Sequence, residues 1–148
     1  MPPSSRHATR ARSAARRQLV QALYQWQLAS QPWQDVYQQF AAQPEFGQAD
    51  GEYFRQALAQ IADGREALDA EMARHAEIAP VQLDPVEHAI LFMGLWELMQ
   101  RPDVPYRVVI NESVELAKRF GATDGHKFVN AVLDRASRVH RAPERGVA

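Results

Sequence analysis

Apolar residues recur at every third or fourth position over most of the chain, which is the spacing of helices that bury one face. Clear examples are Leu19 and Leu23 in one segment and Ile110, Val114 and Ala117 in another. No segment shows the alternation of apolar and polar residues that is typical of a half-buried β-strand. About seven helices are expected, separated by breaks at residues 30–33, 44–51, 63–64, 80–84, 101–105 and 121–124. The pattern predicts an all-α bundle with short connections.

Three aspartates are placed to begin helices. Asp84 is followed by Pro85, a residue favoured at the first helical position, and by Glu87 three residues after the cap. Asp50 can cap the helix that follows the 44–51 loop, and Asp63 precedes a glutamate at capping-box spacing. These signals fix where three of the helices should start.

A corner between two helices is expected at residues 121–124. Gly121 can adopt the left-handed conformation that ends a helix, and Thr123 or Asp124 can accept the free N–H groups of the next one. Upstream, the run from Ala89 to Trp96 is apolar on all sides, as expected for a helix surrounded by others. We therefore expect this run to be the centre of the core.

The composition fits one domain and excludes several kinds of site. A chain of 148 residues can bury roughly two thirds of its unfolded surface. It has no cysteine, so disulfides and thiolate chemistry are excluded. No apolar run resembles a signal peptide or could cross a bilayer, so a cytoplasmic protein without membrane contact is expected. We expect a flexible arginine-containing arm at residues 1–9, a helical domain at 10–140 and a frayed tail at 141–148.

Basic charge is concentrated near the N-terminus, although the net charge is only −1. Five arginines and no acidic residue precede Asp35, and the remainder has 12 basic and 18 acidic residues. At about 100° per residue, Arg10, Arg17 and Tyr24 project opposite the apolar stripe. Guanidinium groups there can pair with phosphates, and the ring can stack on a base.

A second interpretation of this basic face is open. Arg12 and Arg16 project near the edge of the apolar stripe, and Tyr24 could be a half-buried packing group. Arginines on an exposed helix face often serve solubility alone. The sequence pattern by itself therefore leaves RNA binding and simple solvation as alternatives.

The sequence has no signature of catalysis. Phosphate-binding glycine loops, nucleophile elbows and paired metal-binding histidines on a helix are missing. The five histidines, at positions 7, 75, 88, 126 and 140, show no pair at metal-ligand spacing. His126 lies beside Asp124 and Lys127, which favours a capped first helical turn over a catalytic site. We expect no enzyme activity, no cofactor and no metal.

Four segments resemble the NusB family of bacterial transcription antitermination factors. The most specific are DVPYRVVINESVELAKRFG and DGHKFVNAVLDR, and the upstream segments LDPVEHAILFMGLWEL and RQLVQALYQWQL are similar as well. The chain departs from the family at Gly125, where serine is usual, at Ala131, where glycine is usual, and at Phe92, where a basic residue is common. The resemblance implies two packed helical subdomains in a single RNA-binding unit.

The resemblance also implies where RNA would bind. In the family an arginine-rich N-terminal region helps to bind boxA RNA, and Arg12 and Arg16 match it best. The helix corner contributes as well, although Phe120 and Phe128 could be core residues and Asp124 could only cap. With the helix projection added, the candidates are Arg10, Arg12, Arg16, Arg17, Tyr24, Lys118, Phe120, Asp124, Lys127 and Phe128.

The expected partners follow from the same resemblance. They are NusE, which is a basic ribosomal protein of the small subunit, single-stranded boxA RNA of nascent ribosomal transcripts, and RNA polymerase reading through terminators. Glu87 is the candidate for contact with NusE, although its place in a capping box is a simpler explanation. Two alternatives are a helical protein adaptor without RNA affinity and a relative of the RNA-binding domain of ribosomal RNA methyltransferases, which would need a separate cofactor domain.

Overall fold

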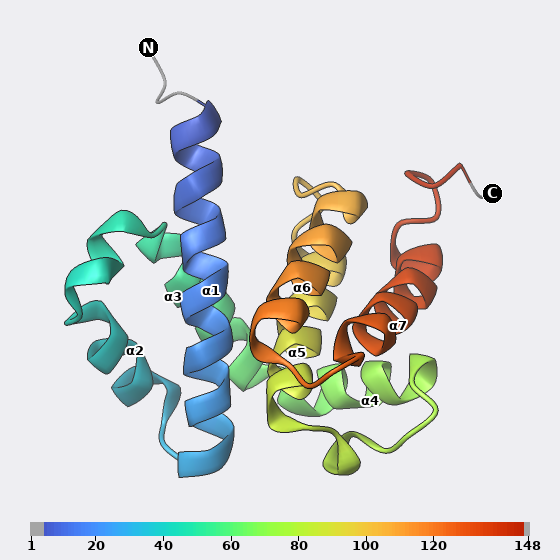
Figure 1. Cartoon of the computed structure of the whole chain (residues 1–148), viewed down its shortest axis with the longest axis horizontal. Coiled ribbons are helices and arrows are strands. Elements are labelled where there is room, and N and C mark those ends of the chain that lie inside the picture. Colours follow the sequence, from blue (N-terminus) through green and yellow to red (C-terminus); the bar gives the residue numbers. More distant parts are fainter. Residues whose placement is uncertain (1–4, 147–148) are drawn as a thin grey trace. The chain divides into compact units, whose positions relative to one another are not determined.

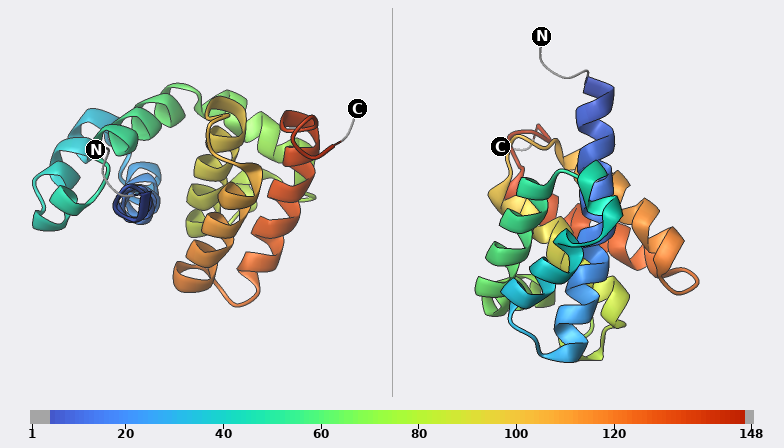
Figure 2. Two further views of the ribbon diagram at one scale, coloured as in Figure 1. Left: turned by 90° about the horizontal axis from the view of Figure 1, so that it is seen from above. Right: turned by 90° about the vertical axis from the view of Figure 1, so that its left-hand side faces the viewer.

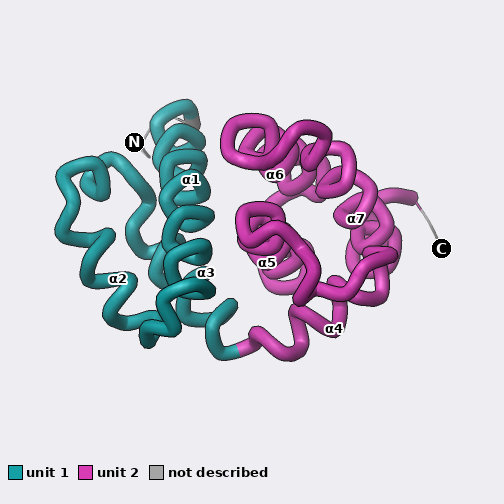
Figure 3. The backbone as a smooth tube through the Cα atoms, turned by 60° about the horizontal axis from the view of Figure 1, so that its bottom comes forward, with its two compact units in different colours: residues 1–63 teal, residues 64–148 magenta. Residues whose placement is uncertain are grey.

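The computed structural model describes residues 5–146, which form seven α-helices and two 3₁₀ helices and contain no strand (Figure 1). The all-α prediction is confirmed. The elements are α1 (Ser5–Ala29), α2 (Trp33–Ala41), η1 (Pro44–Gln48), α3 (Gly51–Asp63), α4 (Arg65–His75), η2 (Pro80–Gln82), α5 (Pro85–Gln100), α6 (Tyr106–Phe120) and α7 (Gly125–His140). They divide into two compact units, unit 1 up to Asp63 and unit 2 from Gly64 onward (Figure 3). None of the helices in residues 5–146 has the length and apolar character needed to span a membrane.

Unit 1 packs α1 against α2 and α3. Phe54 on α3 is fully buried and is surrounded by aromatic rings. Its ring centroid lies 6.1 Å from that of Tyr37, 5.8 Å from that of Phe40 and 5.4 Å from that of Phe46. Offset and edge-to-face contacts of this kind add to the stability gained from apolar burial. The aromatic cluster thus fixes α2 and η1 against α3.

Unit 2 is built around α5, which contacts α4, α6 and α7. Figure 2 shows α5, α6 and α7 side by side in yellow-green, orange and red. Every residue of α5 from Glu87 to Leu98 is buried, so the expected centre of the core is confirmed. Close packing with α7 depends on Gly94, because a Cβ there would lie 2.8 Å from Leu133 Cδ1. Such a distance is too short for two carbon atoms.

Two of the three predicted aspartate caps are confirmed. Asp84 Oδ1 accepts a hydrogen bond from Val86 N at 2.8 Å, and Asp50 Oδ1 accepts from Tyr53 N at 3.1 Å. The capping box at Asp63 is wrong, because α3 continues through this residue and the N-cap of α4 is Gly64, with no side-chain hydrogen bond. The break between α3 and α4 is nevertheless where the sequence indicates it.

The corner between α6 and α7 uses different backbone geometry from that predicted. Gly121 is extended, at φ −88° and ψ 177°, and the left-handed residue is Asp124, at φ 67°. Glycine is needed at 121 for space, since a Cβ there would lie 2.7 Å from the carbonyl oxygen of Ala117. The Asp124 side chain makes no capping hydrogen bond, so neither the left-handed glycine nor the aspartate cap is found.

The two ends of the described chain are more ordered than a flexible arm and a frayed tail. Helix α1 begins at Ser5, so residues 5–9 are helical, and residues 1–4 of the expected arm lie outside the described residues. Residues 44–48, expected as part of a loop, form the 3₁₀ helix η1. The largest difference concerns Arg141, which is only 5% exposed.

Arg141 closes the C-terminal end of α5. Its guanidinium donates to four backbone carbonyl oxygens, those of Leu98 (2.9 Å), Val104 (2.8 Å), Glu97 (3.1 Å) and Arg101 (2.8 Å). The last carbonyl groups of a helix have no partner within the helix, and the planar fork of arginine can satisfy several at once. Residues 141–146 are therefore held in place by long-range contacts that local sequence patterns do not reveal, and residues 147–148 of the expected tail lie outside the described residues.

Candidate nucleic-acid interface

The first half of α1 carries exposed basic side chains on one face. Arg10 is exposed and Arg17 half-buried, and seven residues place them two helical turns, or about 10 Å, apart. Tyr24 lies a further two turns along the same face and is 40% exposed. Arginine side chains are long and flexible, so the two guanidinium groups can contact different phosphates of one nucleic acid strand.

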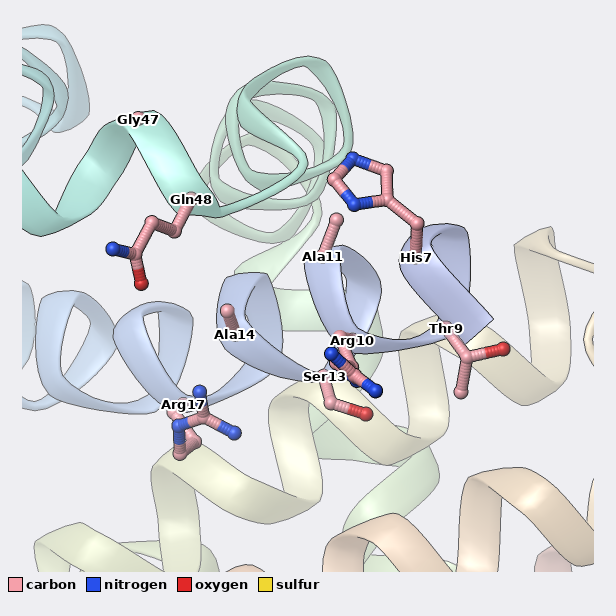
Figure 4. Close-up of a pocket in the computed structure, with 9 residues that line it drawn as sticks. All are labelled: His7, Thr9, Arg10, Ala11, Ser13, Ala14, Arg17, Gly47 and Gln48. Atoms are coloured by element: carbon pink, nitrogen blue, oxygen red, sulfur yellow. The ribbon is translucent and has the colours of Figure 1, made fainter. Parts of the chain in front are cut away.

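A hollow of about 490 Å³ lies between this face of α1 and η1 (Figure 4). The residues that line it are His7, Thr9, Arg10, Ala11, Ser13, Ala14, Arg17, Gly47 and Gln48. None of these lining residues is acidic, while guanidinium, hydroxyl and amide groups are all present. Such a set can donate hydrogen bonds to phosphate, sugar and base oxygens together.

Two contacts fix η1 beside α1 and so form the hollow. Gln18 Nε2 donates to Glu45 O at 3.2 Å, and the backbone N–H of Asp50 donates to Ala11 O at 2.9 Å. Gln48 and Gly47 belong to the hollow only because of this packing, and the sequence analysis did not find them. No local pattern could identify them, since the contacts join residues 27 and 39 positions apart.

Arg12 and Arg16 lie on the inner side of α1, toward α3. The Arg12 guanidinium stacks 3.8 Å from the centre of the Tyr53 ring, and its Nε lies 3.4 Å from Asp50 Oδ2. Arg16 lies 5.8 Å from the same ring centre and is 3% exposed. Cation–π contacts and an ion pair hold these side chains in one position. Arg16 is thus less accessible than Arg10 and Arg17, whereas Arg12 is half-buried like Arg17.

The α6–α7 corner in unit 2 presents a second set of candidates. Lys118 is exposed and lies 3.4 Å from Glu115 Oε1, and Lys127 Nζ lies 3.3 Å from Asp124 Oδ1 in an exposed pair. Phe120 and Phe128 are half-buried, so neither belongs to the fully buried core. The corner therefore offers exposed charges beside partly accessible aromatic rings.

Arg119 completes the corner and was not among the candidates. Its guanidinium carbon lies 5.2 Å from the centre of the Phe120 ring, a distance at which the cation is attracted to the ring. The sequence signal that could have identified Arg119 is an arginine next to an aromatic residue at the end of a helix. The candidates thus fall into two groups, one on α1 and η1 in unit 1 and one at the α6–α7 corner in unit 2.

Glu87, the candidate for partner contact, is 7% exposed, and its Oε2 has no hydrogen-bond partner among the described residues. Its carboxyl group points at the start of α7, where it occupies the space that a Cβ on Gly125 would need. Burial raises the pKa of Glu87 to about 7, with a further contribution from the neighbouring Asp84 carboxyl. This carboxyl is therefore partly protonated near neutral pH, which is an unusual state for a surface contact.

Comparison with known proteins gives one consistent result. The model of the NusB family matches residues 13–138. The transcription antitermination protein NusB of Pseudomonas fluorescens is 48% identical over 124 residues, which are 84% of this chain and 75% of that protein. All of the most similar curated relatives carry the same description, which names a role in transcription and no enzyme.

Solved structures show the same fold. NusB of T. maritima superposes with a TM-score of 0.79 at 23% identity, covering 91% of this chain and 96% of that one. A structure described as antitermination factors NusB and NusE in complex with double-stranded RNA superposes with a TM-score of 0.70 at 22% identity, covering 86% of this chain and 96% of that one. The family model, which matches most of the chain, and the close relatives identify the same family. The chain belongs to the NusB family of transcription antitermination proteins.

Proposed function

We propose that this protein binds single-stranded boxA RNA in nascent ribosomal transcripts together with NusE and promotes read-through by RNA polymerase. Such a factor would work in the cytoplasm and would bind and tether its partners without catalysing a reaction. The observation that carries the proposal is the hollow between α1 and η1, with Arg10 and Arg17 among its lining residues and no acidic side chain. Membership of the NusB family supports it, as does the solved assembly that contains NusB, NusE and RNA.

The two groups of residues would have different roles in RNA binding. Arg10 and Arg17 would contact phosphates, because guanidinium groups bind them regardless of base sequence. Arg12 and Arg16 would support this surface from the inner side of α1 and supply positive potential. At the corner, Phe120 and Phe128 would stack on bases, while Lys118, Asp124 and Lys127 would make polar contacts with RNA.

Glu87 would have an indirect role in binding NusE. Its buried carboxyl group lies against the first residue of α7, so it would shape that surface and would not pair directly with a basic partner. This modifies the sequence-based expectation of a direct contact.

The test is fluorescence anisotropy with a labelled boxA RNA, a scrambled strand of the same length and a boxA duplex, with and without NusE. We expect preference for single-stranded boxA that NusE strengthens. The double variant Arg10→Ala/Arg17→Ala should weaken binding to boxA and to the scrambled strand by similar factors. Arg55→Ala is the matched control, because it removes an exposed arginine of unit 1 outside the hollow.

The possible outcomes separate the proposal from its alternatives. Binding of NusE with no affinity for any RNA would identify a protein adaptor. Stronger binding to the duplex than to the single strand would contradict the proposed substrate. Equal effects of the Arg55 control and the double variant would show that the hollow is not the contact surface.

A further inference from the structure

Helices α4 and α7 bring two histidines onto one carboxylate in unit 2. The Nε2 atom of His75 lies 2.8 Å from Oε1 of Glu71, one turn earlier on α4. The Nε2 atom of His140, the last residue of α7, lies 2.8 Å from the same oxygen. Figure 3 shows α4 beside α7 within this unit. Three potential ligand atoms, separated by up to 69 positions in sequence, therefore meet at one point.

The cluster is well shielded from solvent. The side chains of Glu71 and His75 are 9% and 10% exposed, and that of His140 is 22% exposed. A carboxylate this shielded from water needs hydrogen-bonding or charged partners, and here the two imidazoles provide them.

Neighbouring groups leave Oε1 of Glu71 to the histidines. Arg74 Nε lies 3.8 Å from the other carboxylate oxygen, Oε2, and the Arg74 side chain is 74% exposed. Arg135 Nη1 donates to the backbone carbonyl of His75 at 2.8 Å, which fixes the end of α4 beside α7. Arg74 therefore faces the carboxylate oxygen that the histidines do not contact, and Arg135 keeps the end of α4 beside α7, where His140 is located.

We propose that Glu71, His75 and His140 form a binding site for a divalent transition metal, with Zn²⁺ as the preferred ion. The three ligand atoms lie within 4.8 Å of one another. Around tetrahedral Zn²⁺, with bonds of about 2.0 to 2.2 Å, adjacent ligand atoms are about 3.3 Å apart. The present 2.8 Å distances need to open by only about half an ångström. Two imidazoles and one carboxylate select Zn²⁺ over Mg²⁺ and Ca²⁺, which prefer oxygen ligands alone.

Zn²⁺ binding would change which ring nitrogen of each histidine carries a proton, and it would replace the hydrogen bonds to Glu71. A carboxylate oxygen only accepts hydrogen bonds, so each Nε2 that donates to Glu71 carries a proton. A metal needs the lone pair of Nε2, so each neutral ring would keep its proton on Nδ1. A water molecule would fill the fourth position, beside the partly exposed His140. The metal would link the ends of α4 and α7 and stabilise unit 2.

The proposed site departs from the sequence-based expectation that the chain holds no metal. Glu71 and His75 are four residues apart and share one helix face, a spacing that a search for paired histidines misses. His140 is brought to them only by the packing of α7 on α4. The proposal does not depend on RNA binding.

Isothermal titration of the full chain with ZnCl₂ tests the site directly. We expect one Zn²⁺ per chain, and the visible absorption of bound Co²⁺ should show tetrahedral coordination with nitrogen and oxygen ligands. His140→Gln and His75→Gln should each weaken Zn²⁺ binding more than about 10-fold, since a lost ligand costs at least as much as a lost supporting group. His126→Gln, which alters a histidine outside the cluster, should bind Zn²⁺ like the unaltered chain.

The result is decisive even if a variant folds poorly, because the unaltered chain must bind Zn²⁺ by itself. The partly exposed His140 is the position where substitution disturbs packing least, and circular dichroism checks its helix content. Absence of stoichiometric binding to the unaltered chain overturns the proposal. So does binding that His126→Gln reduces as much as His140→Gln, because this would indicate adventitious binding to surface histidines.

Discussion

At the scale of single residues, buried charged groups determine much of the behaviour of unit 2. Arg141 and Glu87 are both nearly inaccessible to solvent, at 5% and 7% exposure, but their surroundings differ. Arg141 has a backbone carbonyl for each of its nitrogen atoms, whereas one oxygen of Glu87 has no partner in residues 5–146. A buried charge stabilises a protein only where its hydrogen bonds are satisfied. The two residues should therefore affect stability in opposite directions.

Replacing Arg141 with alanine should destabilise the protein strongly. The change removes a donor from four carbonyl groups: those of Glu97 and Arg101 keep a backbone donor, whereas those of Leu98 and Val104 lose the donor that Arg141 provides. We expect a loss of about 3 kcal/mol in the free energy of unfolding. Arg141→Lys should recover only part of this, because a single ammonium group cannot reach four carbonyls. Urea denaturation measures the effect. Arg138→Ala is the control, since this exposed residue has only a surface ion pair, and an equal loss there would contradict the assignment.

Glu87 should make stability fall as the pH rises. The pKa is about 7 in the folded protein and about 4.3 in the unfolded chain. Between these values the folded state holds a proton that the unfolded state has released, so the free energy of unfolding falls from about pH 4.5 to 7 and then levels off. The expected change is on the order of 3 to 4 kcal/mol.

The variant Glu87→Gln isolates this effect from other titrating groups. Urea denaturation at pH 5 and pH 8 should show a smaller decrease in the variant than in the unaltered protein, and the variant should be the more stable of the two at pH 8. If the free energy of unfolding fell equally between pH 5 and pH 8 in the variant and in the unaltered protein, Glu87 would not be the source of this pH dependence.

At the scale of elements, close approach of helices depends on small residues and on what faces them. The start of α7 packs against the Glu87 carboxyl through Gly125. Phe92 on α5 stacks on His88 with ring centroids 4.4 Å apart. Both residues are therefore set by what packs against α5.

Replacing Gly125 with alanine should force the Glu87 side chain to move. We expect a loss of about 1 to 3 kcal/mol, typical of overpacking, measured by urea denaturation. Gly47→Ala is the matched control, because a Cβ there would have nothing within 4 Å. In the double variant Gly125→Ala/Glu87→Ala most of the loss should disappear. Strictly additive effects would show that the two residues do not interact.

The α5 helix should be the element most sensitive to truncation. Leu91 is fully buried, so Leu91→Ala removes apolar contacts and leaves a cavity, at a cost of about 2 to 5 kcal/mol. Leu28, which is 58% exposed, provides the control, and Leu28→Ala should change stability by less than about 0.5 kcal/mol. Thermal unfolding followed by circular dichroism distinguishes the two. A similar small effect at both positions would contradict the central role of α5.

The sequence predicted those elements that local interactions determine. Proline breaks, apolar spacing and the caps at Asp50 and Asp84 located the helices, because each depends on residues within a few positions. The closing of α5 by Arg141, the packing of η1 on α1 and the cluster at Glu71 depend on contacts between distant residues. Arg12 and Arg16 were placed at the edge of the apolar stripe, but the ring of Tyr53 that stacks with Arg12 could not be inferred. The fold was thus more predictable than the candidate site.

At the scale of the whole molecule, charge is separated along the chain. The basic N-terminal segment and the more acidic remainder give a net charge of only −1, so nonspecific attraction to nucleic acid by the molecule as a whole should be weak. Affinity for RNA must then come from local groups of basic side chains. The salt dependence of RNA binding should therefore report how many phosphates the protein contacts.

We expect a moderate salt dependence of RNA binding. If three to five phosphates are neutralised, the slope of log K against log salt concentration should be about −2 to −3.5 for a single strand. The variant Arg10→Ala/Arg17→Ala should reduce the steepness by about 1.4, which corresponds to two phosphates. Anisotropy titrations at four salt concentrations measure both slopes. A slope near zero for the unaltered protein would exclude the arginines of α1 as the source of affinity.

The position of Arg141 has a practical consequence for defining the limits of this domain. The match to the family model ends at residue 138, three residues before the side chain that satisfies the end of α5. A protein shortened to the matched segment would keep all seven helices, with α1 shortened by its first eight residues and α7 by its last two. It would nevertheless lack the side chain that donates to the carbonyl groups of Leu98 and Val104. The part of a chain that similarity identifies and the part that can fold independently are therefore different here, and the boundary for folding lies beyond α7.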